Sequence, residues 1–408
     1  MKSIKNFFLV YVDVNLILAL AILFSNITNY FLQIFIARKI SIEDFATYNL
    51  LNSLIIVVLF PLQSLFFFFT KKISTLYNSN KLFLNEFLLS LIKFAVILSL
   101  LEILIAIFIF KFFYNLKITL LIIILNIIFF SNILLIFQAY FIGRNLFKYN
   151  AYLNYLMSIS KIFLIYFFIN FSLYGIFFSI NLSILFALIF SLFILYKKSN
   201  YKLLWRKINT NFLLTYKKDI IRSFVYSGTL IMLTQIDIII VSRIYSEDFL
   251  AIFSAAAILG KLIIFLPGIL SYTLIPRINE KILLLKKNQD FIITLIFTIL
   301  SSILVCLFFY NYSYEFLRFI YGDKYLLSAS ILKYISFFYF PMSVLTIIFP
   351  YFYTINSDFF FYSTIFFFVI LFLLLFFANN YLSVLFMIFA VTFLLCISGL
   401  IARFNFSK

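Results

Sequence analysis

The chain has 408 residues, of which 65% are hydrophobic and only 11% are charged. A soluble protein of this length could not hydrate the surface that such a composition leaves exposed. The composition therefore excludes a soluble enzyme or binding domain. Long apolar runs without strict alternation predict membrane-spanning helices in place of the strands of a membrane barrel.

The formal net charge is +18. Lysine and arginine accumulate in the cytoplasmic loops of membrane proteins, so we expect membrane lipids and no nucleic acid as partners of these charges. The chain has no histidine, and its two cysteines lie in apolar runs, so no metal site is predicted. Its glycines are scattered singly, and without a phosphate-binding loop we predict no cofactor and no ATP hydrolysis or sugar transfer.

A membrane-spanning helix needs about 20 apolar residues, and this ruler predicts about twelve spans. They cover, in chain order, residues 14–37, 45–70, 87–112, 118–141, 151–171, 174–196, 221–243, 248–275, 291–310, 326–352, 359–378 and 381–403. No small-residue cleavage site follows the first span, which is therefore expected to be a retained helix.

Orientation and domain organisation follow from the loops. Lysine and arginine are about three times as frequent in the segments on one side as on the other, which predicts that both termini are cytoplasmic. The longest predicted loop mixes basic residues with Trp205 and several leucines, and fits either a helix lying on an anionic leaflet or a solvated linker. We therefore predict a six-helix bundle over 1–196, a basic cytoplasmic linker over 197–220 and a second six-helix bundle over 221–408.

A short motif repeats half a chain length apart: Glu43-Asp44-Phe45 returns as Glu247-Asp248-Phe249. With an even number of spans in each half, the two bundles have the same orientation and a pseudo-twofold axis along the membrane normal. Such a fold encloses a cavity between the bundles and works by rocking one against the other. Pro61 and Pro267-Gly268 interrupt the second span of each half. Each interruption fits either a helix that is broken at a binding cavity or a kink that neighbouring helices tolerate.

Three patches resemble polysaccharide flippases of the multidrug/oligosaccharidyl-lipid/polysaccharide (MOP) exporter superfamily. The segment 237–278 resembles the start of that family's second half, with Asp237, the run Phe253-Ser254-Ala255-Ala256 and a distal Pro276. The segment 36–48 resembles the first loop, with Ala46-Thr47 where the family often has glycine. The segment 321–332 resembles the loop before span ten.

The resemblance implies an O-antigen repeat-unit (Wzx-type) flippase. Such a protein moves undecaprenyl-diphosphate-linked oligosaccharides to the outer leaflet of the bacterial cytoplasmic membrane by alternating access, for O-antigen, capsule or another surface polysaccharide. Polysaccharide polymerase and chain-length proteins are its implied partners, and H+ or Na+ its implied coupling ion.

Two alternatives stand beside it. One is a small-molecule/cation antiporter of the same MATE-like fold; the excess of basic over acidic residues inside the spans argues against it. The other is a membrane-embedded polysaccharide polymerase or ligase. The short predicted external loops argue against that class.

Charges inside spans mark candidate sites, because each costs about 2.5–3.5 kcal/mol at a helix centre. Lys161 and Lys261 lie deepest, and we predict that they bind the substrate diphosphate from a cavity, a buried ion pair being the alternative. Lys93 and Lys333 are further candidate cavity cations, although they lie near helix ends where snorkelling explains them.

The intramembrane acids Asp237 and Glu102 are candidates for ion coupling, and an ion pair with a neighbouring span is the preferred explanation of Asp237. Asn26, Asn29 and Gln33 of the first span could meet sugar hydroxyls or join helices.

The two repeated turns could form a periplasmic gate of ion pairs between the bundles, or carry ordinary loop charges. The residues of this predicted gate are Arg38, Glu43, Asp44, Arg243, Glu247 and Asp248.

Overall fold

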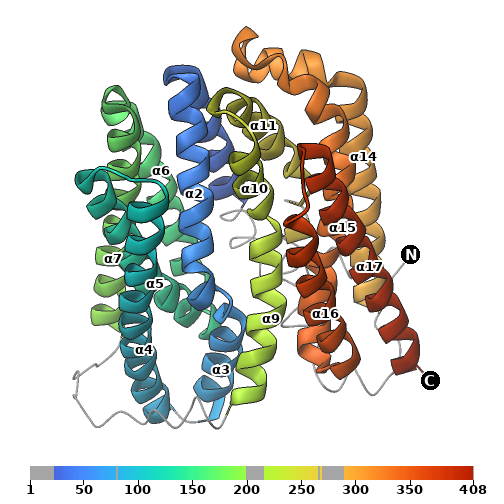
Figure 1. The fold of residues 1–408 in the computed structure, drawn as a ribbon. Coiled ribbons are helices and arrows are strands. Elements are labelled where there is room, and N and C mark those ends of the chain that lie inside the picture. The colour runs from blue at the N-terminus through green and yellow to red at the C-terminus, as the bar shows by residue number, and fades with distance from the viewer. Residues whose placement is uncertain (1–22, 80, 199–215, 265–266, 269–288, 408) are drawn as a thin grey trace. The chain divides into compact units, whose positions relative to one another are not determined.

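The computed structural model describes residues 23–79, 81–198, 216–264, 267–268 and 289–407 (Figure 1). Every regular element within these ranges is a helix. Most of the predicted basic linker, the start of the first predicted span and Pro276 lie outside the described residues.

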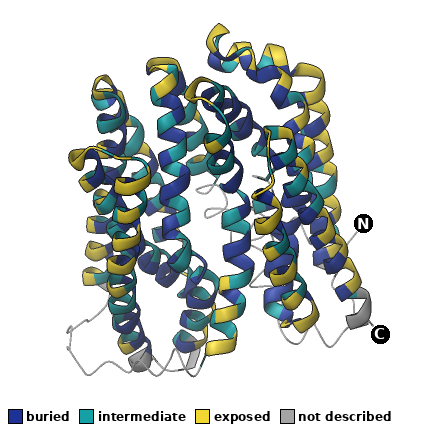
Figure 2. Ribbon diagram, in the orientation of Figure 1, coloured by how far each residue is buried: buried dark blue, intermediate teal, exposed yellow. Residues whose placement is uncertain are grey.

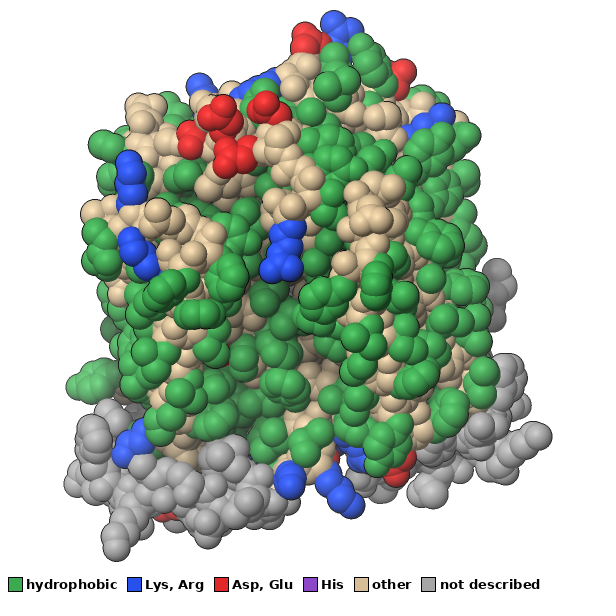
Figure 3. Space-filling view, in the orientation of Figure 1, with side chains coloured by type: hydrophobic (Ala, Val, Ile, Leu, Met, Phe, Trp, Pro, Cys, Tyr) green, Lys and Arg blue, Asp and Glu red, His purple; other side chains and the backbone are tan. Residues whose placement is uncertain are grey.

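Eight helices of the described chain are long and apolar enough to cross a membrane, and a ninth span is formed if the bent pair α9–α10 counts as one. On the face shown in Figure 3, hydrophobic side chains cover most of the helix surfaces. Exposed positions run along many of the helices in Figure 2. Many exposed residues are large and apolar, among them Phe112, Phe319 and Phe377. Side chains of this kind are stable facing lipid but not water, so the prediction of an all-α membrane protein is confirmed.

The described chain forms two compact units. The N-terminal unit contains residues 23–40 and Ile55–Phe224. Its elements after the helical residues 23–39 are the end of α2 (Ile42–Gln63), α3 (Phe66–Ser79), α4 (Lys81–Ile107), the π-helical turn η1 (Phe108–Phe113), α5 (Ile118–Gly143), α6 (Phe147–Phe168), η2 (Ile169–Phe171), α7 (Ser172–Lys198) and the start of α9 (Lys217–Leu233). Helix α7 packs on both α5 and α6, and α4 packs on α5.

The C-terminal unit contains Ser41–Leu54 and the described residues from Val225 onward. Its elements are the start of α2, the end of α9, α10 (Ile236–Ile244), α11 (Glu247–Gly260), α14 (Gln289–Tyr321), η3 (Asp323–Tyr325), α15 (Ser328–Ile355), α16 (Asp358–Leu375) and α17 (Tyr381–Ser407). Helix α15 is the centre of this unit, since it packs on α11, α14 and α17 and most of its residues are buried.

Helices α2 and α9 each contribute to both units. The ring of Phe45, near the start of α2, lies 5.4 Å from the ring of Tyr325 in the C-terminal unit. The hydroxyl of Ser223, in the first part of α9, donates to the backbone carbonyl of Ser64 in the N-terminal unit, 2.7 Å away. Segments 41–54 and 217–224 are thus packed with helices from the other half of the sequence.

The repeated motif begins a helix in both halves, α2 at Ile42 and α11 at Glu247. The interruption that follows lies close to the predicted Pro61 in the first half, at Ser64-Leu65, but away from Pro267 in the second half. Helix α2 continues past Pro61 and ends at Gln63, while α11 ends at Gly260, well before Pro267. The interruption at Lys261 is a single turn residue, because residues 262–264 are helical again, and it follows Gly260, a residue type that lowers helix stability.

The structure also extends one predicted element. Helix α14 runs to Tyr321, beyond the predicted end at residue 310, and bends at Tyr312, whose φ is −120° and ψ is 19°. The helix is longer than the apolar stretch that was used to predict it. Charged residues such as Glu315 and Arg318 end the apolar stretch, but they are compatible with a helix that continues into the membrane interface.

Candidate functional site

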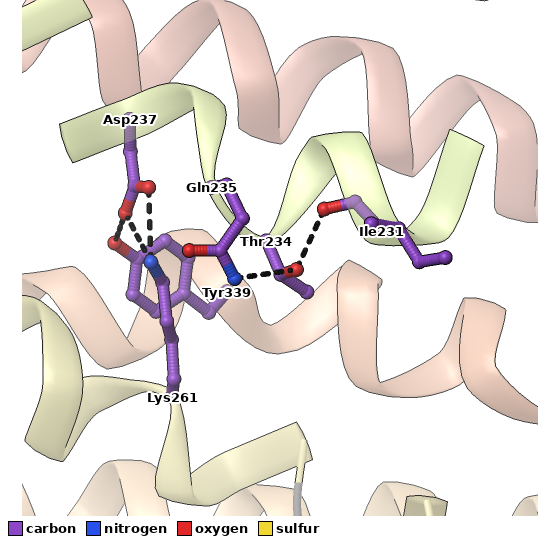
Figure 4. A network of polar contacts seen from close by, with 6 residues as sticks. All are labelled: Ile231, Thr234, Gln235, Asp237, Lys261 and Tyr339. Atoms are coloured by element: carbon purple, nitrogen blue, oxygen red, sulfur yellow. Dashed lines mark hydrogen bonds and ion pairs between the residues drawn. The ribbon is translucent and has the colours of Figure 1, made fainter. Parts of the chain in front are cut away.

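Three side chains from three helices meet inside the C-terminal unit (Figure 4). The Lys261 ammonium lies 2.9 Å from each carboxylate oxygen of Asp237. The Tyr339 hydroxyl donates to Asp237 Oδ2, and the Lys261 ammonium lies 5.6 Å from the centre of the Tyr339 ring. Asp237 has no exposed surface and the Lys261 side chain is 14% exposed. The structure therefore brings together one predicted coupling acid and one predicted substrate cation as a buried ion pair.

Both charges of this pair stand at helix ends. Helix α9 ends at Leu233, and the chain bends by 44° before α10 begins at Ile236, so Asp237 lies in the first turn of α10. Lys261 is the C-cap of α11. The helix macrodipole is positive at the N-terminus and negative at the C-terminus. It therefore stabilises an acid at the N-terminus and a cation at the C-terminus. The two helix breaks thus supply part of the stabilisation that the buried ions need.

Polar side chains also fill the bend between α9 and α10 (Figure 4). The Thr234 hydroxyl donates to the Ile231 carbonyl at 2.7 Å, and Gln235 Nε2 donates to Thr234 Oγ1 at 3.1 Å. The Ile231 carbonyl accepts from the Thr234 amide as well, at 3.2 Å, so these contacts hold the bend with both backbone and side-chain bonds.

Close helix packing lets Tyr339 reach the pair. A Cβ atom added to Gly260 would lie 2.7 Å from Ile335 Cγ2 and 3.3 Å from the Tyr339 ring. The absent side chain at Gly260 therefore allows the end of α11 to approach α15 at the height of Tyr339.

The N-terminal unit holds the second intramembrane lysine in a different environment. The Lys161 ammonium, on α6, donates to Asn29 Oδ1 at 3.1 Å. One turn earlier on α6, the Ser158 hydroxyl bonds Ser25 at 3.0 Å. Within the part of the chain that the structure describes, no acid forms an ion pair with Lys161. Its half-buried charge is matched only by neutral polar atoms.

Of the other predicted polar residues in the first span, Asn26 is half-buried and Gln33 is half-buried with its amide oxygen enclosed. Gln138 of α5 and Asn154 of α6 continue the polar contacts of this unit, with 3.4 Å between their amide groups. Neither of these two was among the predicted site residues.

Glu102 lies in the interior of the N-terminal unit and is 1% exposed. The side-chain amide nitrogen of Asn132, on α5, donates hydrogen bonds to Glu102 Oε2 at 2.5 Å and to the Ser99 hydroxyl at 3.0 Å. Glu102 Oε1 and Asn132 Oδ1 have no hydrogen-bond partner. No lysine or arginine of the described chain forms an ion pair with Glu102. The carboxyl group is thus buried among neutral partners, the Asn132 amide and the Leu62 backbone.

The two remaining lysines lie in different surroundings. Lys333 of α15 lies over the Tyr310 ring at 4.5 Å and the Tyr334 ring at 5.7 Å, and the exposed rings of both tyrosines are typical of an interfacial aromatic belt. Lys93 is half-buried on α4. A role of either lysine in substrate binding stays a prediction.

The predicted gate residues occupy helix ends. Glu43 and Asp44 stand in the first turn of α2, where the Asp44 amide donates to Ser41 Oγ at 3.0 Å. Glu247 and Asp248 stand in the first turn of α11, and Arg243 in the last turn of α10. Each charge has the sign that its helix end favours. Arg38 is exposed beside the end of the first described helix, and ion pairing between the two turns stays a prediction.

The patches that carry the sequence resemblance converge in the C-terminal unit. Phe45 packs against Tyr321 and Tyr325 on either side of the left-handed Gly322, and the Ser328 hydroxyl donates to the Ile252 carbonyl at 2.7 Å. Burial raises the pKa of the Tyr325 hydroxyl, which therefore stays neutral. These motifs fix packing between helices.

The partners of the charged residues were missed by the sequence analysis. Tyr339 and Asn132 each stand alone in an apolar run, and no spacing links them to the acids that they bind. Their only signal was a polar atom inside a predicted span, which must find a partner in lipid. The described residues contain no group of three or more His, Cys, Asp or Glu that could hold a metal ion.

The sequence matches no protein-family model and no curated protein. Its fold does match solved structures. An outward-facing multidrug resistance MATE family transporter of the MOP superfamily has a TM-score of 0.73 at 16% identity, over 97% of this chain and 95% of that one. An inward-facing MATE family transporter has a TM-score of 0.68 at 14% identity, over 95% and 98% of the two chains. A MATE in complex with MaD3S has a TM-score of 0.71 at 16% identity, over 97% and 95%.

These likenesses establish the architecture. The chain has the MATE fold, twelve helices in two bundles, as the fold prediction stated.

Proposed function

We propose that this protein is a membrane transporter that flips a diphosphate-linked oligosaccharide lipid across the bacterial cytoplasmic membrane by alternating access. One observation carries the proposal: Lys161 is an intramembrane cation whose hydrogen-bond partner is a neutral amide. A cation without a counter-ion is costly inside a membrane, so its presence calls for an anion that comes and goes. The diphosphate of a lipid-linked sugar is such an anion.

The contrast with Lys261 sharpens the choice of residue. The charge of Lys261 is already balanced by Asp237, so a diphosphate would have to compete with a buried carboxylate for it. Lys161 has no such competitor among the described residues, and lysine offers a mobile point charge suited to a ligand that must be released. We therefore assign the phosphate-binding role to Lys161, with Asn29 and Asn26 beside it for sugar hydroxyls.

The alternative of a cation antiporter is less well supported. A cavity for cationic drugs needs an accessible acid, whereas Asp237 has no exposed surface and Glu102 is 1% exposed. Fold likeness alone does not separate the two, because the matched structures are named as multidrug transporters. An anionic cargo is favoured because the half-buried intramembrane charge, that of Lys161, is positive.

Glu102 is the proposed coupling residue. A carboxyl group in an apolar interior is far more stable neutral than charged, so it takes up a proton readily and releases it when water gains access. The absence of an ion pair at Glu102 within the described chain leaves the proton as the species that neutralises it. Protonation and release would then couple the cycle to the proton gradient.

The proposal includes the setting of the protein. Both termini would face the cytoplasm, as the distribution of lysine and arginine predicts. Polysaccharide polymerase and chain-length proteins would receive the flipped unit outside.

Complementation of a flippase-deficient strain tests the role of Lys161. Lys161→Arg should keep part of the surface polysaccharide because the charge is kept, Lys161→Ala should lose most of it, and Lys161→Glu should lose all of it. Lys117→Ala is the matched control, since that lysine is exposed at the start of α5 in the same unit and was not among the predicted site residues. Full activity of Lys161→Glu at normal protein level would rule out phosphate binding by this residue.

A further inference from the structure

We propose that Lys333, Tyr310 and Tyr334 bind the phosphate group of a resident anionic phospholipid at the surface of the C-terminal unit. Lys333 supplies the positive charge and the two tyrosines supply hydroxyl donors. This site is independent of the proposed transport function, because the lipid that it binds belongs to the surrounding membrane and is not the cargo.

The three side chains form one cluster on two neighbouring helices. The Lys333 ammonium lies 4.5 Å from the centre of the Tyr310 ring, on α14, and 5.7 Å from the centre of the Tyr334 ring, on α15. The two ring centres are 6.4 Å apart. Lys333 is half-buried, while Tyr310 and Tyr334 are 44% and 51% exposed, so another molecule can reach the cluster from outside.

The polar groups of the cluster are not used by the described chain. Within that part of the protein the Lys333 ammonium forms neither an ion pair nor a hydrogen bond. The hydroxyl groups of Tyr310 and Tyr334 form no hydrogen bond with described residues either. A cation–π contact stabilises an ammonium but leaves its N–H donors without an acceptor. The cluster therefore presents one positive charge and several hydrogen-bond donors to a neighbouring molecule.

The cluster lies at a depth that corresponds to the membrane interface. Lys333 is about one and a half turns inside the start of α15 at Ser328, and Tyr310 lies just before Tyr312, where α14 bends. A lysine at this depth can extend its ammonium to the phosphate groups of lipid headgroups, and tyrosines are enriched at the same level.

The surface on the membrane side of the cluster is apolar. Phe337 is exposed one turn after Lys333, and its ring lies 6.1 Å from the Tyr310 ring. On α14, Leu307 and Leu304 are exposed about one and two turns before Tyr310, on the same side of the helix. A charged site directly above an apolar strip fits a phospholipid, whose acyl chain would lie on the strip. Free phosphate would leave the strip unused.

Charge complementarity favours an anionic lipid. A zwitterionic headgroup carries its own cation beside the phosphate, and that cation competes with Lys333 for it. Phosphatidylglycerol carries a net negative charge without a competing cation, so its phosphate can accept charge-assisted hydrogen bonds from the ammonium. The predicted orientation puts this end of α15 on the outer side, so the lipid would belong to the outer leaflet.

The test measures which lipid lies beside Phe337. In a Trp205→Phe background, Phe337→Trp gives the full-length protein a single tryptophan at the edge of the site. The protein is reconstituted into mixed bilayers of phosphatidylcholine and phosphatidylglycerol, one of which carries bromine on its acyl chains and quenches any tryptophan that it contacts. Phosphatidylglycerol should bind at this position at least about fivefold more tightly than phosphatidylcholine. Equal binding of the two lipids would overturn the proposal.

Variants of the cluster test which groups cause the preference. Lys333→Met should remove it and Lys333→Arg should keep it. Phe372→Trp in the same Trp205→Phe background is the matched control, because Phe372 is exposed on α16, a helix without lysine or arginine. This control should show no preference. An equal preference at Phe372→Trp would show that the whole protein attracts anionic lipid, and would contradict a specific site.

Two competitors distinguish the sources of phosphate. Inorganic phosphate should leave the quenching unchanged, and undecaprenyl diphosphate should displace the brominated lipid no better than the same amount of unbrominated phosphatidylglycerol. Stronger displacement by undecaprenyl diphosphate would assign the cluster to the cargo and overturn the proposal. If Lys333→Met does not fold, Tyr310→Phe/Tyr334→Phe replaces it. Loss of the two hydroxyl groups should weaken the preference, and an unchanged preference would contradict the site.

Discussion

Asp237 and Lys261 stand at the facing ends of two different helices, the N-terminus of α10 and the C-terminus of α11, and form a buried ion pair with 2.9 Å between Lys261 Nζ and each carboxylate oxygen. A pair of this kind contributes little net stability, but the loss of one partner leaves an uncompensated charge in a low-dielectric interior. The pair therefore restricts how these helices can pack. Its effect on the free energy of unfolding becomes large only when one of the two residues is replaced.

This cost gives the first prediction. Lys261→Ala should destabilise the protein by about 3–5 kcal/mol, because it strands the Asp237 carboxylate without exposure to water. Asp237→Asn/Lys261→Ala should restore most of the folded protein. Folded yield by fluorescence-detected gel filtration in potassium buffer measures both. Equal yields of the single and double variants would show that the pair has no structural role.

The second prediction concerns Glu102. Glu102→Gln keeps the size of the side chain and a bond to Asn132 while it fixes the neutral state, so the variant should fold normally. Transport driven by a proton gradient should fall at least about tenfold, if proton release from this residue is required.

Glu86→Gln is the matched control for Glu102, because Glu86 is an exposed acid on the same helix α4. Dependence on the imposed pH gradient in proteoliposomes separates the two variants. An undiminished response of Glu102→Gln to the gradient would remove Glu102 from the coupling mechanism.

The fold was largely predictable because membrane spans obey a length rule. Apolar stretches of about 20 residues predicted helices wherever the chain is described. The repeated Glu-Asp-Phe motif, interpreted as a turn, stands at the start of α2 and α11, close to the predicted span starts at residues 45 and 248. Both starts put acids in the first helical turn, a local preference that the sequence displays openly.

The position of helix breaks was less predictable. Pro267 drew the predicted break away from Gly260, where the helix ends. A glycine in a membrane helix can mark a close contact between helices or a break, and the helix that packs against it determines which of the two occurs. Here that neighbour is α15, through Ile335 and Tyr339.

The partners of the charges could not be predicted at all. The choice between a cavity role and an ion pair for Lys261 depends on Asp237 and Tyr339, which lie on other helices and share no spacing with it. For the same reason, Lys161 and Lys261 looked alike in the sequence and differ in the structure. Tertiary packing assigns the counter-ion to one and a neutral amide to the other.

A third prediction tests the close approach of α6 and α7. A Cβ atom on Gly175 would lie 1.8 Å from the Phe168 backbone oxygen, which belongs to the turn and cannot move as a side chain can. Gly175→Ala should therefore abolish most of the folded yield. Gly268→Ala is the control, because a Cβ atom there meets nothing within 4 Å. Normal yield of Gly175→Ala would show that the turn tolerates a side chain.

The fourth prediction concerns topology. Ser41 and Ser246 are exposed at the starts of α2 and α11, and Cys306 and Cys396 are buried. Single cysteines at Ser41 and Ser246 should react with an impermeant maleimide on intact cells, and one at Ser79 only after permeabilisation. The reverse pattern would place the termini outside.

The most direct measurement of the central claim is transport by the purified protein in liposomes. A fluorescent diphosphate-linked oligosaccharide lipid should move between leaflets faster than in protein-free liposomes, and Lys161→Glu should abolish this movement while Lys161→Arg keeps part of it. Cationic dyes offered to the same liposomes should not be transported. Transport of the dyes, together with a flipping rate no higher than in empty liposomes, would contradict the assignment of an anionic lipid cargo and identify the protein as a cation transporter.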